Sequence, residues 1–164
     1  MLPGFFSLAR IEQILTDIAL AIRGDSASFK GFFYHSSAAQ SVANATFTVI
    51  LFDTKVFDLI GSYNTANGRF TPRVAGYYQF ISGIGLLNAG DQSTIHTVVR
   101  KNGVNQAWTR VRMSGTGEAQ GTISEVVYLD GVTDYIDFAI YTSGGATSTT
   151  FGISNTWAQG YLLK

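Results

Sequence analysis

The feature that most constrains the fold of this chain is a run of seven residues in which aromatic side chains recur at the spacing of short strands. The run consists of Phe52, Asp58, Tyr63, Phe70, Gly76, Tyr78 and Phe80, with five, four, six, five, one and one residues between successive members. Alternate residues of a strand point to the same side of a sheet, so Tyr78 and Phe80 are expected to enter a core together. Burying one large apolar side chain contributes about 1.5–3 kcal/mol, and the run therefore predicts the centre of an all-β core.

The rest of the sequence from about residue 28 predicts many short strands separated by turns. The strand candidates are 46–52, 68–74, 77–87, 93–101, 105–113, 122–129, 135–141 and 149–163. Asn102-Gly103 predicts a two-residue hairpin, and Pro72 favours an edge position or a strand start for its segment. Eight or more antiparallel strands of this kind favour a jelly-roll β-sandwich.

The seven residues resemble the signature of one family, the globular head of complement component 1q, which is related to the tumour necrosis factor fold. The segment 157–163 is similar to the closing strand of that family, and Ser82 stands where the family usually has a further aromatic residue. The resemblance spans most of residues 46–163. It implies an antiparallel jelly-roll sandwich of which three copies pack around an axis through aromatic and aliphatic strand faces. Interface candidates under that implication are Tyr77, Tyr135 and Tyr141, which could equally be ordinary exposed strand tyrosines.

The composition favours a partly covered surface. Charged residues make up 13% of the 164 residues and hydrophobic ones 46%, whereas soluble proteins average about 25% charged residues. Another copy of the chain is the simplest cover, and a Gly-rich and Thr-rich β protein with polar, uncharged loops is the alternative. A net charge of zero without a basic stripe argues against nucleic-acid binding. The absence of Cys excludes disulfides and thiolate metal sites, and favours assembly in a reducing cytoplasm.

Three zones are expected: an apolar tip at 1–6, a helix at 7–23 and a jelly-roll head at 24–164. Charged residues interrupt the apolar run of the helix and no cationic start precedes it, so neither a signal peptide nor a membrane span is expected. In the helix, apolar residues spaced three and four apart form a seam of Leu8, Ile11, Leu15, Ile18 and Ile22. Leu at the a positions with Ile at the d positions shifts preference to three or four strands. A helix of 17 residues is marginal alone, so the seam predicts a trimer or packing against another surface.

Residue clusters that support catalysis are missing from the sequence. The two histidines, His35 and His96, stand alone, and no nucleophile elbow or phosphate loop is present. We therefore expect neither an enzyme nor a cofactor. Some relatives bind calcium near the trimer axis, but no dense acidic loop is seen and no metal site is expected among the scattered carboxylates Asp53, Asp58, Asp91, Asp130, Asp134 and Asp137.

One strand presents a candidate ligand patch. Trp108, Arg110 and Arg112 lie two apart, so they share one face and could contact an acidic glycan or a partner protein. Solvated arginines beside a packed Trp are the alternative.

Together these features predict a non-enzymatic virion structural protein, most plausibly of a bacteriophage. It would be a homotrimeric capsid decoration or fibre component, made in the host cytoplasm and located on the virion surface. Attachment to a capsid or other scaffold protein is expected through Leu2, Phe5 and Phe6. The alternative function is a receptor-binding adhesin whose loops recognise a host-surface glycan or protein.

Overall fold

The computed structural model describes residues 30–163 except positions 146, 150, 151 and 153, and this part of the chain contains thirteen strands and no helix. The strands form two antiparallel sheets that face one another across an apolar core. The predicted all-β sandwich is therefore confirmed. The expected tip at 1–6 and helix at 7–23, with their attachment and seam residues, lie outside the described residues.

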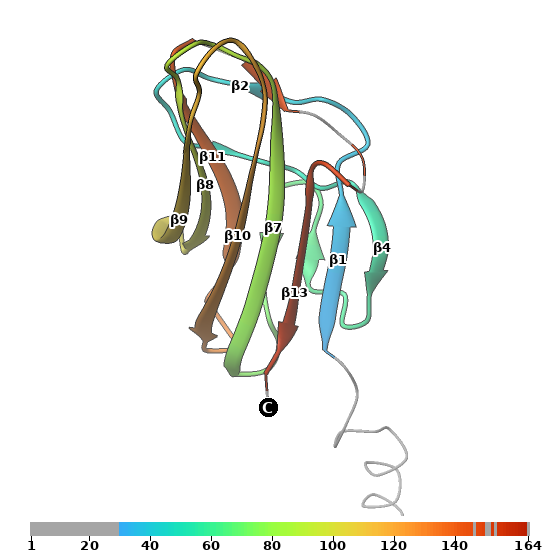
Figure 1. Cartoon of the computed structure of the whole chain (residues 1–164). Coiled ribbons are helices and arrows are strands. Elements are labelled where there is room, and N and C mark those ends of the chain that lie inside the picture. The colour runs from blue at the N-terminus through green and yellow to red at the C-terminus, as the bar shows by residue number, and fades with distance from the viewer. Residues whose placement is uncertain (1–29, 146, 150–151, 153, 164) are drawn as a thin grey trace, which may run out of the picture.

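The larger sheet is built around one long strand, β7, which pairs with β13 and β12 along one edge and with β10 along the other. Hydrogen-bonded neighbours in this sheet follow the order β2-β12-β7-β13-β1-β4, and β10 pairs with the other edge of β7. Figure 1 shows β7, β13, β1 and β4 side by side. Its seven members are β1 (Gly31–His35), β2 (Ser41–Val42), β4 (Thr54–Asp58), β7 (Gly76–Ala89), β10 (Gly117–Leu129), β12 (Thr147–Thr149) and β13 (Trp157–Leu162).

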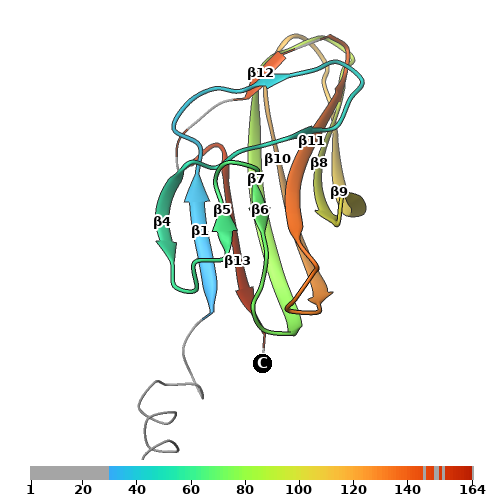
Figure 2. The ribbon, with the colours of Figure 1, turned by 180° about the vertical axis from the view of Figure 1, so that it is seen from behind.

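The smaller sheet is built around β11, which pairs with β8 on one edge and with β6 and β3 on the other (Figure 2). Its order is β5-β6-β11-β8-β9. The six members are β3 (Thr48–Val49), β5 (Tyr63–Asn64), β6 (Arg69–Phe70), β8 (Thr94–Lys101), β9 (Val104–Arg112) and β11 (Ile136–Ser143).

The aromatic rings between the sheets pack against one another. Phe32 from β1 stacks on Phe70 with ring centroids 4.8 Å apart, and Phe70 meets Phe80 edge-on at 5.5 Å. Phe138 of β11 closes the cluster from the second sheet, 6.2 Å from Phe80. These four side chains are fully buried, and such pairs add about 0.5–1.5 kcal/mol each beyond the area that they bury.

The sequence located the long strands β7 to β11 but missed the short strands β1, β2, β4 and β5, and it merged others. The hairpin at Asn102-Gly103 is confirmed, because both residues have positive φ (54° and 78°) and Lys101 pairs with Val104 across the turn. The candidates 46–52 and 68–74 shrink to the two-residue strands β3 and β6, and 149–163 divides into β12 and β13.

The two ends of the described chain meet at one end of the sandwich, which we call the base. The backbone N–H of Leu162 donates to the carbonyl of Lys30 at 2.9 Å. The connections that precede β8, β10 and β12 lie at the opposite, distal end, with β2 and β12 (Figures 1 and 2). The fold therefore has two separate ends, the base with the chain ends and the distal end with the connections. The described ranges include no helix long and apolar enough to cross a bilayer.

Candidate functional site

The acid of the seven-residue signature organises a turn. The carboxylate of Asp58 accepts hydrogen bonds from the backbone N–H groups of Ile60, Ser62 and Tyr63 and from the hydroxyl of Tyr34, at 3.2–3.3 Å. From the last position of β4, this carboxylate thus fixes the turn that leads into β5. Asp58 has a structural environment rather than a catalytic one.

The aromatic members of the signature lie in the core: Phe52, Phe70, Tyr78 and Phe80 are fully buried and Tyr63 nearly so. The phenol of Tyr63 accepts the backbone N–H of Phe52 at 3.2 Å, and burial raises the pKa of this phenol. Gly76 lies where a side chain would meet Leu162, since an added Cβ would be 2.7 Å from its Cδ1.

The outward side of the seven-stranded sheet carries a continuous set of aromatic side chains, which we call the aromatic face. Phe33 lies between Phe57 and Trp157, with ring centroids 6.1 and 6.0 Å away, and Tyr77 meets Tyr128 edge-on at 5.3 Å. Members of the aromatic face are Phe33, Phe57, Tyr77, Val126, Tyr128, Trp157 and Tyr161, from β1, β4, β7, β10 and β13.

Charge is missing from the centre of the aromatic face. Strands β1, β7 and β13 contain no Asp, Glu, Lys or Arg. Near the base, Tyr77 is 60% exposed, Tyr128 49% and Val126 46%. Depletion of charge with enrichment of aromatic residues is typical of the buried centre of protein interfaces, so this face has the chemistry of a surface that another chain covers.

The outward side of the six-stranded sheet is different, and we call it the basic face: His96, Trp108, Arg110, Arg112 and Tyr141. Trp108, Arg110 and Arg112 alternate along β9 and are exposed, as their spacing predicts. His96 lies opposite Arg110 on β8, and Tyr141 lies opposite His96 on β11. Partial burial and the neighbouring Arg110 guanidinium lower the pKa of His96.

The three tyrosines that the sequence offered as interface candidates lie on different surfaces. Tyr77 belongs to the aromatic face, whereas Tyr141 lies on the basic face, 5.4 Å from the His96 ring. Tyr135 lies beneath the guanidinium of Arg69, 4.0 Å from its ring centre. The structure does not bring the three together, and the sequence missed Tyr128 as a partner for Tyr77.

The distal connections are fixed by side-chain hydrogen bonds. Asp91 accepts the N–H of Gly115 at 2.5 Å, which joins the connection after β7 to the one after β9. Asn44 accepts the N–H groups of Gly144 and Gly145 at 3.1 and 3.0 Å. Four connections far apart in sequence are thus held in two pairs at this end.

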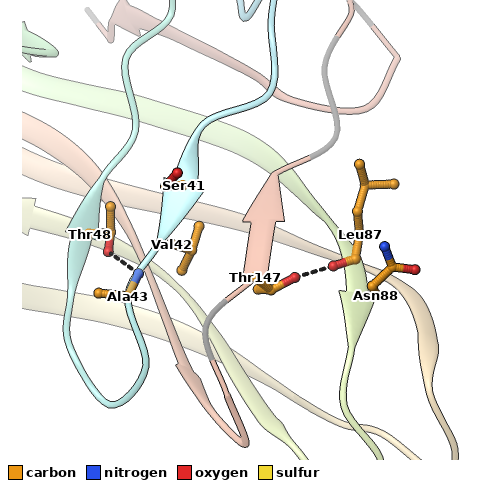
Figure 3. A pocket seen from close by; sticks show the side chains of 7 residues that line it. All are labelled: Ser41, Val42, Ala43, Thr48, Leu87, Asn88 and Thr147. Carbon is orange, nitrogen blue, oxygen red and sulfur yellow. Dashed lines mark hydrogen bonds between the residues drawn. The ribbon is translucent and has the colours of Figure 1, made fainter.

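A hollow of about 560 Å³ opens at the distal end between β2, β12 and the end of β7 (Figure 3). The hydroxyl of Thr147 donates to the carbonyl of Leu87, and that of Thr48 accepts the N–H of Ala43 at 3.4 Å. The remaining lining residues are Ser41, Val42 and Asn88. The lining is uncharged, with hydroxyl and amide groups beside aliphatic ones, which suits a small neutral polar group rather than an ion.

The carboxylates considered for calcium do not converge. Within the described ranges, no group of three or more His, Asp or Glu residues is placed to hold a metal ion. Asp53 accepts from Ser37, and Asp137 pairs with Arg100 at 2.5 Å. Asp130 accepts the hydroxyl of Thr133, which together with backbone N–H groups holds the pKa of this carboxyl well below its usual range. These carboxylates are engaged by the protein's own donors.

A family model, the C1q domain, matches residues 32–163. The chain belongs to the C1q domain family. Solved structures similar to this C1q domain include the globular domain of zebrafish complement 1qA, with 12% identity, 84% of this chain and 98% of that chain covered, and a TM-score of 0.60. Murine APRIL matches with 12% identity, 83% and 100% coverage and a TM-score of 0.64. Eiger TNF from S. frugiperda matches with 11% identity, 83% and 93% coverage and a TM-score of 0.63.

At these identities the structural matches establish the fold of the C1q domain alone. The comparison with curated proteins finds no match. The comparisons therefore give the family and the fold of this chain.

Proposed function

We propose that this protein is a non-enzymatic structural component of a bacteriophage virion: a homotrimeric capsid decoration or fibre head, attached through its N-terminal segment. The observation that carries the proposal is the aromatic face, with Tyr77, Tyr128 and Val126 about half exposed and no charge in β1, β7 or β13. An exposed aromatic surface of this kind is a liability in a monomer, and self-association about a symmetry axis covers it.

The polarity of the sandwich supports attachment through the N-terminal segment. Chain preceding β1 enters at the base, where Lys30 and Leu162 are hydrogen bonded, and the distal connections lie at the other end. A segment that holds a scaffold from the base leaves the distal end facing outward. We propose that residues 7–23 associate through the predicted seam, and that Leu2, Phe5 and Phe6 dock on a capsid or other scaffold protein.

Two measurements test the two halves of this proposal separately. Native mass spectrometry of the full chain at micromolar concentration should give a trimer, and a stable monomer would refute the self-association. Deletion of residues 1–6 should leave the trimer intact and abolish binding to the particle, as imaged by electron microscopy of labelled protein. Undiminished attachment of the deletion variant would exclude the proposed docking residues.

A second candidate function is a receptor-binding adhesin that recognises a host-surface glycan or protein. The observation that favours it is the hydrogen-bonded distal end, where Asp91 and Asn44 each join two connections that are far apart in sequence. Loops held on a rigid scaffold lose little entropy on binding. Binding of the protein to host cells, weakened by substitutions in these connections, would favour this candidate over a purely structural role.

A further inference from the structure

The two outer sides of the sandwich differ in charge. Strands β8, β9 and β11, which carry the basic face, contain Arg100, Lys101, Arg110, Arg112 and His96 but only one acidic residue, Asp137. Asp137 is 2% exposed and is neutralised by Arg100 at 2.5 Å, and Lys101 pairs with Asp134 at 2.8 Å. Positive charge without an acidic partner is therefore concentrated on Arg110 and Arg112.

The two guanidinium groups are available for a ligand. Arg112 donates only to the neutral amide oxygen of Gln92, at 3.1 Å, and Arg110 has neither a hydrogen bond nor an ion pair with any residue that the structure describes. Asp91, the acid beside Gln92 in sequence, is engaged by the backbone N–H of Gly115. Residues two apart in a strand are roughly 7 Å apart, so the pair can bind two anionic groups in sequence along one chain.

Aromatic rings lie beside these cations in register across three strands. His96 lies next to Arg110, its ring is 5.4 Å from that of Tyr141, and Phe47 continues the row 5.3 Å beyond Tyr141. Trp108, one step along β9 from Arg110 on the same side, is 58% exposed although it lies opposite the fully buried Val98. The indole therefore presents an exposed surface beside two guanidinium groups that have no acidic partner.

We infer that the basic face binds an acidic polysaccharide, with Arg110 and Arg112 pairing to its carboxylate or sulfate groups and Trp108 stacking on a sugar ring. Guanidinium groups bind carboxylate and sulfate oxygens through paired N–H donors. Aromatic faces accept the apolar C–H side of a pyranose ring. The basic face and the aromatic face belong to opposite sheets.

Nucleic acid and protein fit this face less well. Affinity for nucleic acid grows with the number of phosphates neutralised, and two free arginines on a chain of zero net charge provide few. Protein partners usually place large side chains into desolvated pockets at the interface centre. On this side of the sheet the apolar residues Val98 of β8 and Ala139 of β11 are already fully buried, so they offer no exposed apolar surface to such a side chain.

The test is binding of the full chain to alginate, a polyuronate, by biolayer interferometry, with neutral dextran and poly-glutamate as comparison probes. The double variant Arg110→Gln with Arg112→Gln should lose about tenfold or more in alginate affinity, since two charge-assisted pairs are removed. Trp108→Ala should weaken alginate binding several-fold and leave poly-glutamate binding unchanged. A control with the same change in charge, Lys55→Gln with Arg73→Gln, removes exposed cations away from the basic face. Circular dichroism confirms that each variant is folded.

The expected result is alginate binding that weakens with added salt, is absent for dextran, and is unaffected in the control variant. Failure of the unmodified protein to bind alginate would overturn the inference, as would full binding by the double arginine variant. If poly-glutamate binds as tightly as alginate and Trp108→Ala weakens neither, the face would instead be assigned to an acidic protein. That result would overturn the inference of a polysaccharide ligand.

Discussion

Tyr77 and Tyr128 lie directly opposite one another on β7 and β10 and meet edge to face, with ring centroids 5.3 Å apart. Cross-strand aromatic pairs stabilise a sheet by about 0.2–1 kcal/mol, yet both rings remain about half exposed. The pair therefore contributes less to its own domain than its size allows. About half of the surface of the pair stays exposed on this domain.

We predict that Tyr77→Glu combined with Tyr128→Glu converts the proposed trimer to monomers, because charges buried at an interface without partners are strongly unfavourable. Sedimentation velocity at micromolar concentration measures the change. Val132→Glu is a matched control, because Val132 is 78% exposed and lies in the connection after β10, off the aromatic face. A double variant that keeps the mass of the unmodified assembly would show that the face is not the contact.

Gly160→Ala should destabilise the domain by about 1–3 kcal/mol through overpacking. A Cβ at this position would lie 2.5 Å from Cδ1 of Phe80 and 2.8 Å from Cε1 of Phe32, in the middle of the aromatic core. Urea unfolding followed by tryptophan fluorescence gives the free energy of unfolding. Gly117→Ala, where an added Cβ meets nothing within 4 Å, should change this free energy by less than about 0.5 kcal/mol. Equal effects of the two substitutions would refute the packing argument.

Tyr63→Phe should cost about 1–3 kcal/mol, because it leaves the buried backbone N–H of Phe52 without an acceptor. The ring itself stays, so its stacking is preserved. Thermal unfolding compared with Tyr128→Phe, which removes a hydroxyl from a half-exposed ring, isolates the hydrogen bond. A melting temperature equal to that of the Tyr128→Phe variant would mean that water replaces the phenol as acceptor.

Acidification should destabilise the fold through His96. Partial burial and Arg110 lower the pKa of His96 below its ordinary value of 6.5, so the unfolded chain takes up a proton at higher pH than the folded one. The stability contribution is fully present above about pH 6.5 and is lost as the pH falls toward the folded pKa. Arg110→Gln should raise the folded pKa of His96 and reduce this loss.

Proton NMR titration of the two imidazoles, with His35→Gln used for assignment, measures the pKa of His96 directly. A pKa at or above 6.5 in the unmodified protein, or one that does not rise in Arg110→Gln, would contradict the assigned causes.

The sequence predicted the core better than the surfaces. Phe70, Tyr78 and Phe80 could be placed because strand alternation and large apolar side chains are local properties. The strand β1 was missed although Phe32 and Tyr34 alternate with Phe33 and His35, because three aromatic residues in succession hide a period of two.

The candidate surfaces depend on register between distant strands, which local patterns do not determine. Trp108, Arg110 and Arg112 could be grouped because they alternate along one strand. The position of Tyr141 beside His96 depends on the pairing of β8 with β11, which lie 45 residues apart at these positions. The pairing of Tyr77 with Tyr128 likewise appears only when β7 and β10 are aligned. The absence of charge from β1, β7 and β13 was visible in the sequence and could have identified the aromatic face.

The two ends of the described chain lie side by side at the base, where Leu162 donates to Lys30. This arrangement determines how the pairing of β1 with β13 responds to mechanical load. Tension between the two neighbouring chain ends would separate β1 from β13 by breaking their hydrogen bonds one after another from the base. Tension between the segment before β1 and the distal end instead acts along the strands, so the five residue pairs that join β1 to β13 share the force. A head held at its base and pulled at its distal end would therefore be loaded along its strands, the direction in which the β1–β13 pairing resists force best.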